Sequence, residues 1–223
     1  MARSTLSRSA SEVSPAASSR SKRGDIFTIA VHHFGRQGYE DTKWADIAAD
    51  AGIGSTALYH YFESKLHCLF EIMSESLLQF RAVFDEVTQE HGRFDDGFVA
   101  LLNASFDLSE SGVLRCRILV AEQGRLGQPR DAERGEEARR RALSRIAERE
   151  VSWSNYLSRG MATGAIPEAD PLLLARAVLG LYDSVWHWYT PRGSLPLPDI
   201  AAFYVPRMLV LVGLGSGALG DGA

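Results

Sequence analysis

The sequence predicts an all-α protein. Apolar residues recur at helical spacing along most of the 223 residues, glycine and proline separate the helical stretches, and no stretch alternates as a half-buried strand does. With 45% hydrophobic and 23% charged residues, the composition is that of a globular protein with a sizeable core. The length fits one large or two modest domains, and we expect two.

The N-terminal region divides into an arm and a first helix. Residues 1–21 are dominated by Ser, Ala and Arg, so they bury too little apolar surface to become ordered, and we expect a flexible arm. A helix is predicted over residues 22–37, and Gly38 ends it. Its apolar face is formed by Ile26, Ile29, Ala30 and Phe34.

Two short helices follow. Thr42 is a suitable N-cap for a helix over residues 43–51, and Gly52 permits the positive φ of a turn. After this turn, Leu58, Tyr59 and Phe62 again recur at helical spacing and predict a helix of about seven residues. Two short helices joined by a glycine-containing turn define helix-turn-helix geometry. We therefore expect a helix-turn-helix domain over residues 22–68.

The rest of the chain, residues 69–223, is predicted to be a larger helical domain. Its expected helices, the first of which starts within the preceding domain, span residues 64–89, 94–108, 114–124, 131–160, 171–189 and 197–214. The helix over residues 171–189 is apolar on two faces, one with Tyr182 and Trp186 and the other with Leu181 and Trp188. A helix of this kind needs cover on both sides. We expect the domain interior on one side and a second subunit on the other.

The second short helix has the side chains of a DNA-reading element. Leu58 and Phe62 are expected to point inward, which leaves hydroxyl, phenol and imidazole groups around the exposed end. Such a helix can enter a major groove, where its side chains reach base edges and phosphates. Lys65 at the start of the next helix is expected to be a point charge for a phosphate.

These residues resemble a known family. The run GYEDTKWADIAADAGIGSTALYHYFESKLHCL over residues 38–69 resembles the helix-turn-helix signature of the tetracycline-repressor (TetR) family of transcriptional regulators. It departs from the family's pattern at residues 54–57, where many members carry a lysine, and at Leu66-His67, where members carry an acidic pair. The resemblance implies these DNA-binding residues: Thr42, Lys43, Ser55, Thr56, Ala57, Tyr59, His60, Tyr61 and Lys65.

The resemblance also implies partners. Members are homodimers that bind double-stranded DNA operators with inverted half-sites, about 34 to 36 Å apart, and repression is their commoner mode. We expect the homodimer to form through the last two helices. The net charge of −4 hides an asymmetry, since residues 1–70 carry +1 and residues 71–223 carry −5. The arm either adds DNA contacts or is a solubilising tail, and its basic residues are Arg3, Arg8, Arg20, Lys22 and Arg23.

In TetR-like proteins the C-terminal domain binds a small molecule, which implies a small hydrophobic effector here. Large apolar side chains in this domain are by default core residues, yet together they suggest a pocket. The candidates are Phe80, Phe84, Phe98, Leu102, Phe106, Ile118, Trp153, Tyr156, Tyr182 and Trp186.

The chain's ending, around residues 164–166 and 186–189, resembles a branch of the family that responds to acyl-CoA thioesters. This resemblance implies that Arg115, Arg117 or Arg125 meets ligand phosphates, although a solvated helix face also explains these arginines. The run Arg139-Arg140-Arg141, flanked by two glutamates, indicates a charged helix surface.

Two other functions were considered. An enzyme could use His60 with Glu63 or His67 with Glu71, but the sequence lacks a zinc-protease motif, a cysteine cluster and a serine elbow, so we expect no catalytic site, metal or cofactor. The second alternative is a helical ligand-binding or scaffolding dimer whose DNA-binding head no longer functions.

Location can also be predicted from the sequence. No run approaches the roughly 20 apolar residues of a membrane span, and the N-terminus has no apolar signal region, so we expect a cytoplasmic protein. Cys68 and Cys116 lie in apolar helical contexts, far from metal-type spacing, and are expected to be reduced and buried.

Overall fold

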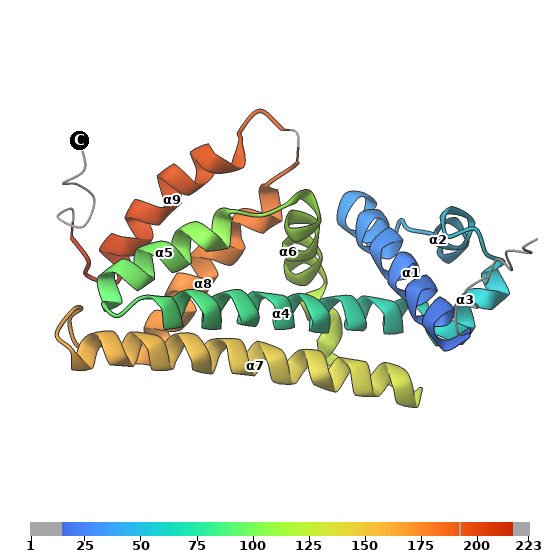
Figure 1. The fold of residues 1–223 in the computed structure, drawn as a ribbon, viewed down its shortest axis with the longest axis horizontal. Helices are drawn as coiled ribbons and strands as arrows, with labels where there is room; N and C mark the ends of the chain where they lie inside the picture. The colour runs from blue at the N-terminus through green and yellow to red at the C-terminus, as the bar shows by residue number, and fades with distance from the viewer. Residues whose placement is uncertain (1–14, 192, 216–223) are drawn as a thin grey trace, which may run out of the picture.

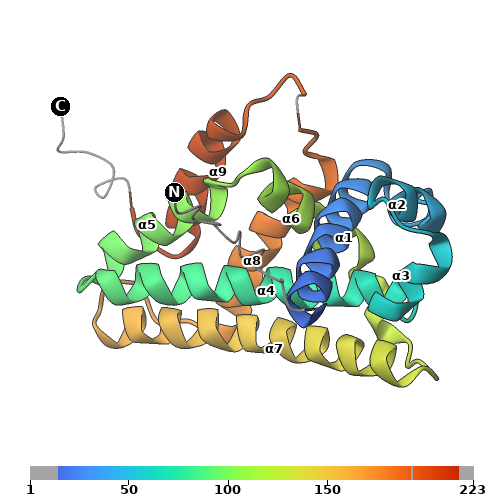
Figure 2. The same ribbon diagram turned by 45° about the vertical axis from the view of Figure 1, so that its right-hand side comes forward.

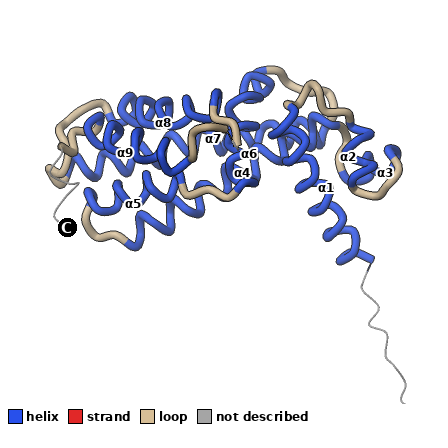
Figure 3. Tube along the Cα trace, turned by 90° about the horizontal axis from the view of Figure 1, so that it is seen from above, coloured by secondary structure: helices blue, strands red, loops and turns tan. Residues whose placement is uncertain are grey.

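The computed structural model describes residues 15–191 and 193–215, and all regular structure within these ranges is helical (Figures 1 and 3). The predicted all-α fold class is therefore confirmed. The elements in chain order are α1 (Pro15–Gln37), α2 (Trp44–Asp50), α3 (Ser55–Tyr61), α4 (Lys65–Glu90), α5 (Phe94–Phe106), α6 (Glu110–Glu122), a 3₁₀ helix (Gln123–Gly127), α7 (Glu133–Ala162), α8 (Pro171–Trp188) and α9 (Leu197–Leu211).

The helices form two packed regions that we call the head and the body. The head consists of α1 to α3 and the start of α4, at the right of Figure 1. In the body, α4 and α7 run side by side along the molecule, and α5, α8 and α9 pack beside them (Figures 1 and 2). No described helix is both long and apolar enough to cross a membrane.

Each region has its own buried cluster. The head cluster joins Ile26, Ile47, Leu58 and Phe62, and it also takes in Leu114 from α6. The body cluster gathers apolar side chains from α4, α5, α6, α7, α8 and α9. Because α6 supplies side chains to both clusters, it ties the head to the body.

Helices α1 and α6 meet at a very close contact. A Cβ atom added at Gly35 would lie 2.6 Å from Cβ of Leu114, a distance that a Cβ atom and a non-bonded neighbour essentially never show. Arg117 on α6 joins three helices at this contact. Its guanidinium donates to the carbonyl oxygens of Gly35 on α1 and Tyr189 at the end of α8. The absence of a side chain at residue 35 is what allows the two helices to touch.

Two N-terminal boundaries differ from the sequence-based expectations. Helix α1 begins at Pro15 rather than at residue 22, so the expected flexible arm is helical over residues 15–21, while residues 1–14 lie outside the described residues. Proline at the start of a helix loses no hydrogen bond, and the alanines that follow favour helix. Thr42 is also not the cap of α2: Lys43 holds that position with no side-chain cap, and the Thr42 hydroxyl donates to the Gly38 carbonyl.

Helix α6 starts at Glu110, four residues earlier than residue 114, where we expected it. Its N-cap is Ser109, whose side chain accepts a hydrogen bond from the backbone N–H of Gly112. A serine N-cap of this kind is the local signal for the earlier start.

Helix α8 is buried on one side and exposed on the other, although Leu181, which was expected on the outer face with Trp188, packs against the body cluster. Val185 and Trp186 are buried on the body side, whereas Ala177 and Trp188 are exposed on the opposite face. Exposed large apolar side chains continue from α8 through α9 and comprise Leu172, Leu173, Trp188, Leu195, Phe203, Val210 and Leu211.

Candidate DNA interface and ligand pocket

The helix-turn-helix is built as the sequence predicts. Gly52 has a φ of +64° and makes the turn between α2 and α3, because only glycine adopts this conformation without strain. Leu58 and Phe62 are fully buried and fix the inner face of α3. Trp44 packs edge-on against Phe62, with ring centroids 6.4 Å apart, and holds the start of α2 to the end of α3.

The outer face of α3 is polar and exposed. Ser55, Thr56, Tyr59 and His60 are exposed and lie at positions i, i+1, i+4 and i+5, which form one face of a helix. Tyr59 is 54% exposed, an unusual fraction for a tyrosine in a folded domain. Helix α3 therefore offers hydroxyl, phenol and imidazole groups to an external partner.

The remaining predicted DNA-binding residues are placed less uniformly. Lys43 is exposed beside α2, and Ala57 and Tyr61 are half-buried at the edges of α3. Thr42 has only 2% of its surface exposed, so its side chain does not reach outward.

Lys65 has a structural role that the sequence did not indicate. Its Nζ donates to the carbonyl oxygens of Tyr39 and Thr42, at 2.7 and 2.8 Å, and lies 4.1 Å from the centroid of the Tyr39 ring. Burial raises the pKa of Tyr39 to about 12 although Arg125 opposes the shift, so the ring stays a neutral phenol under the ammonium group. These contacts pin the loop before α2, and a phosphate contact of Lys65 stays a prediction.

The basic residues of the expected arm fall into two groups. Arg23 is half-buried, and its guanidinium pairs with Glu71 at 3.3 Å and lies 4.7 Å from the centroid of the Phe62 ring. Lys22 is half-buried. Arg3 and Arg8 lie outside the described residues, and the side chain of Arg20 is likewise not described.

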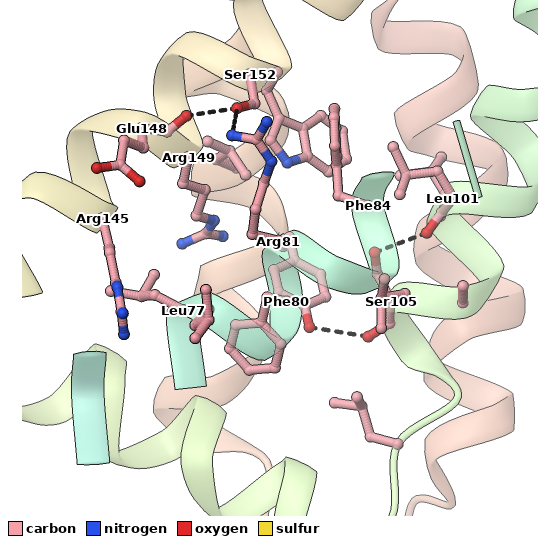
Figure 4. A pocket seen from close by; sticks show the side chains of 18 of the residues that line it. Leu77, Phe80, Arg81, Phe84, Leu101, Ser105, Arg145, Glu148, Arg149 and Ser152 are labelled. Carbon is pink, nitrogen blue, oxygen red and sulfur yellow. Dashed lines mark hydrogen bonds between the residues drawn. The ribbon is translucent and has the colours of Figure 1, made fainter. Parts of the chain in front are cut away.

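The body contains a cavity of about 330 Å³ between α4, α5, α7 and α8 (Figure 4). Of the ten predicted ligand residues, the ones that line it are Phe80, Phe84, Leu102, Trp153 and Tyr182. Ser105 also lines it, and its carbonyl oxygen accepts a hydrogen bond from the Tyr182 hydroxyl at 2.9 Å. The wall is largely apolar with a few polar groups, which is typical of a small-molecule site.

Three arginines line the cavity, and sequence reasoning missed all of them. Arg81 is paired with Asp85 and bonded to Ser152, and Arg149 is paired with Asp183 at 2.7 Å. Arg145 instead donates to Ser74, at 2.6 Å to the carbonyl oxygen and 2.8 Å to the hydroxyl, and within the described chain it has no carboxylate partner.

The cavity's arginines and apolar groups come from several helices, and α4 and α7 each supply both kinds. Figure 4 shows Arg145 and Arg149 on α7 opposite Leu101 and Ser105 on α5. The pocket is therefore amphipathic, because its lining combines cationic groups with apolar ones. The spacing of Arg145, Arg149 and Trp153 at i, i+4 and i+8 was a signal that they share one helix face.

Comparison with known proteins decides the family. Residues 26–72 match the family described as bacterial regulatory proteins, tetR family, and residues 121–212 match the tetracyclin repressor-like C-terminal domain. The chain belongs to the TetR family of transcriptional regulators. Both halves of this TetR-family regulator, the DNA-binding head and the ligand-binding type of body, are therefore assigned, and it is a DNA-binding regulator.

Individual relatives agree with this assignment. The HTH-type transcriptional repressor KstR2 of Mycobacterium tuberculosis is 27% identical over 194 residues, which cover 85% of this chain and 92% of that protein. KstR2 of Rhodococcus jostii is 28% identical over 206 residues, with 87% and 92% covered.

Solved structures share the fold. PfmR of Thermus thermophilus superposes with a TM-score of 0.70 at 24% identity, covering 86% of this chain and 98% of PfmR. AibR, crystallised in complex with isovaleryl coenzyme A and operator DNA, gives a TM-score of 0.70 at 22% identity, with 84% and 97% covered.

Five predicted ligand residues of the TetR-family regulator do not line the cavity. Phe98, Phe106, Tyr156 and Trp186 are buried in the body cluster, where they support the wall from behind. Ile118 belongs to the head cluster instead. Periodicity identified these side chains as buried, but helix packing decides which of them face a cavity.

The arginines expected to meet ligand phosphates are engaged elsewhere. Arg117 joins α1, α6 and the end of α8, and Arg125 pairs with Glu122 and Glu40 at 2.5 Å. Arg115 lies 5.1 Å from the centroid of the Phe27 ring. None of the three lines the cavity.

The pair His67 and Glu71 has a structural role. His67 is buried, its Nδ1 accepts the backbone N–H of Glu63 at 3.0 Å, and its Nε2 lies 3.2 Å from Glu71. With both ring nitrogens engaged, the imidazole is held in one tautomer and orients the chain after α3. Cys68 and Cys116 are buried free thiols, as predicted, and burial raises the pKa of each.

Proposed function

We propose that this TetR-family regulator is a homodimeric repressor that leaves an inverted-repeat operator when a hydrophobic effector with an anionic group, such as an acyl-CoA, fills the body. The observation that carries the operator part is the exposed polar face of α3, held outward by the buried Leu58 and Phe62. Repression is supported by the relatives, because the KstR2 proteins are transcriptional repressors.

The dimer part rests on the uncovered apolar surface of α8 and α9. Trp188 is 46% exposed, Phe203 53% and Val210 64%. Large apolar side chains exposed on two consecutive helices indicate an interaction surface, and a two-fold axis through the last two helices would place two copies of α3 for successive major grooves. Replacing Trp188 and Phe203 by Asp should give a monomer in light scattering and should abolish high-affinity operator binding.

The effector part rests on the amphipathic cavity. Its volume of about 330 Å³ suits an acyl chain rather than a whole coenzyme A, so we place the acyl group inside and the charged part at the arginines. Arg145 is the best anion receptor, because Arg81 and Arg149 already have carboxylate partners. AibR, which shares the fold, was crystallised with isovaleryl coenzyme A.

The operator is tested by selection from a random pool of double-stranded DNA. We expect enriched fragments with inverted half-sites about one helical turn apart, and affinity that falls steeply with salt. Fragments without internal symmetry would contradict the dimeric arrangement. Binding to DNA of every sequence with equal affinity would instead favour a head that no longer reads an operator.

The effector is tested with palmitoyl-CoA, isovaleryl-CoA, palmitate and free coenzyme A. An acyl-CoA should raise the melting temperature and release the selected duplex in fluorescence anisotropy, because a ligand shifts the equilibrium only through unequal affinity for the two states. Arg145→Gln should weaken ligand binding about tenfold and leave duplex affinity unchanged. Tight binding that leaves DNA affinity unaltered would contradict release by this ligand.

A further inference from the structure

The N-terminus of α7 touches the segment that follows the recognition helix α3. The backbone N–H of Gly135 donates to Oε2 of Glu63 at 2.9 Å, and a guanidinium N–H of Arg134 donates to the carbonyl oxygen of Tyr61, the last residue of α3, at 2.9 Å. Further along the two helices, Arg141 on α7 pairs with Glu71 on α4 at 2.9 Å. Polar contacts thus fasten α7 to the head.

Helix α7 has no side-chain cap of its own. Its N-cap residue is Ala132, which has no acceptor group, although its φ of −77° and ψ of 123° are those of an ordinary N-cap. The first N–H groups of a helix need acceptors and carry the positive end of the helix dipole. The Glu63 carboxylate satisfies one of them from 72 positions earlier in the chain.

The surroundings of Gly135 accommodate this contact. Gly135 is buried, and a Cβ atom there would lie at an ordinary contact distance, 3.4 Å, from Oε2 of Glu63. The backbone of Glu63 is fixed as well, because its N–H donates to Nδ1 of His67 at 3.0 Å. This hydrogen bond helps to hold the Glu63 carboxylate in line with α7.

The same helix forms a wall of the cavity. Arg145, Arg149 and Trp153 line it, and Gly135 and Trp153 are about 27 Å apart along α7 at 1.5 Å per residue. Figures 1 and 2 show α7 running the length of α4, from the body to the region below α3. A rigid helix that contacts both sites is a physical connection between them.

We propose that Glu63 is a positioning residue for DNA binding: by capping α7 it ties the recognition helix to the helix that forms the pocket wall. The capped end of α7 then adds to the attachments that α4 and α6 make to the head. Loss of the cap frees the segment after α3 and lowers operator affinity. This proposal rests on the DNA-binding function, and its experiment needs no effector.

The decisive variant is Ala132→Asp in the full-length chain. An aspartate at the N-cap accepts the Gly135 N–H itself, so α7 remains capped while Glu63 loses its partner. We expect an unchanged or higher melting temperature, together with a five- to twentyfold loss of affinity for the selected duplex. If Glu63 contributes only to stability, Ala132→Asp should bind the duplex as tightly as wild type does. That result would overturn the proposal.

Two further variants separate charge from geometry. Ala132→Asn caps α7 without adding negative charge near DNA, and it should lower duplex affinity as Ala132→Asp does. Glu63→Ala should lower both affinity and melting temperature, and Ala132→Asp added to it should restore only the melting temperature. Recovery of both properties in the double variant would contradict the proposed tie.

Amide hydrogen exchange tests the contact between Glu63 and the start of α7 in the absence of DNA. In Glu63→Ala we expect faster exchange in the first turn of α7 and over residues 59–63, and in the double variant protection should return to α7 alone. If the wild-type chain binds no duplex, the proposed operator function fails, yet the exchange pattern still tests the tie. Unchanged exchange over residues 59–63 in Glu63→Ala would overturn it.

Discussion

The recognition helix and the pocket are built in opposite ways. Helix α3 is 7 residues long and presents its functional groups outward, with Ser55, Thr56 and His60 all exposed. The pocket is lined by helices of 13 to 30 residues, and two of its three arginines are already paired with carboxylates. In the head, exposed side chains are available for DNA binding and separate, buried side chains stabilise the fold. In the body, the side chains that line the pocket also stabilise the fold.

This difference makes a prediction about mutants. Changes on the outer face of α3 should alter DNA binding and leave the free energy of unfolding almost untouched. Changes in the body wall should alter stability and ligand binding together. The following four predictions test this contrast.

The largest effect is expected for Phe98→Ala. Phe98 is fully buried, lies stacked on Phe94 at 5.6 Å between ring centroids, and supports Trp153 at 6.3 Å. Removing the ring should lower the free energy of unfolding by about 3–5 kcal/mol, measured by urea denaturation. Val151→Ala, at a position 54% exposed, is the control and should change it by less than about 0.5 kcal/mol. Equal losses in both variants would contradict the assigned packing.

Lys65→Met should alter stability and DNA binding together, unlike the changes on the outer face of α3. It removes two hydrogen bonds to buried carbonyls, so unfolding should become easier by about 1–3 kcal/mol, and duplex affinity should fall by a common factor on all sequences. Normal thermal unfolding with reduced affinity would instead restore the sequence-based role of a simple phosphate contact.

Thr56→Ala should alter recognition alone. The exposed hydroxyl lies on the outer face of α3, so its loss should cost about 1 kcal/mol, or about fivefold, on the selected duplex and change the preference among sequences. Thr28→Ala is a matched control, because the exposed Thr28 bonds only to the Gly24 carbonyl within α1. Comparable losses on selected and scrambled duplexes would argue against a base contact.

The smallest effect concerns Glu71. Burial alone would raise its pKa, but the hydrogen bond from His67 and the charges of Arg141 and Arg23 lower it below the usual value. A carboxyl whose pKa is lower in the folded state stabilises the fold above its unfolded pKa of about 4.3, and this stabilisation disappears as pH falls through the folded value. The Glu71→Gln variant should therefore have a lower free energy of unfolding than wild type at pH 7, measured by urea denaturation. The difference between the two proteins should become smaller at acid pH. A difference that does not change with pH would exclude this linkage.

The local features of the fold could be predicted from the sequence. The burial of Leu58 and Phe62, the turn at Gly52 and the start of α4 within one residue of residue 64 follow from helical spacing and backbone preference. Each of these depends on residues within one or two helical turns. For the same reason, the family signature was readable without a structure.

Features that depend on distant partners could not be predicted. Lys65 was expected to contact a phosphate, yet its ammonium group bonds carbonyls 23 and 26 positions away. Arg139 was assigned to a charged surface, but it is 9% exposed and donates to the Leu126 carbonyl. Spacing identifies a long cationic side chain, whereas the packing of other helices decides what it meets.

The contact between Gly35 and Leu114 has a consequence for evolution and engineering. A methyl group at residue 35 would act as a wedge and force α1 away from α6 without touching DNA or effector. A substitution at this one position would therefore change the orientation of the head relative to the body. Residue 35 is a starting point for engineering a biosensor that responds at a different effector concentration.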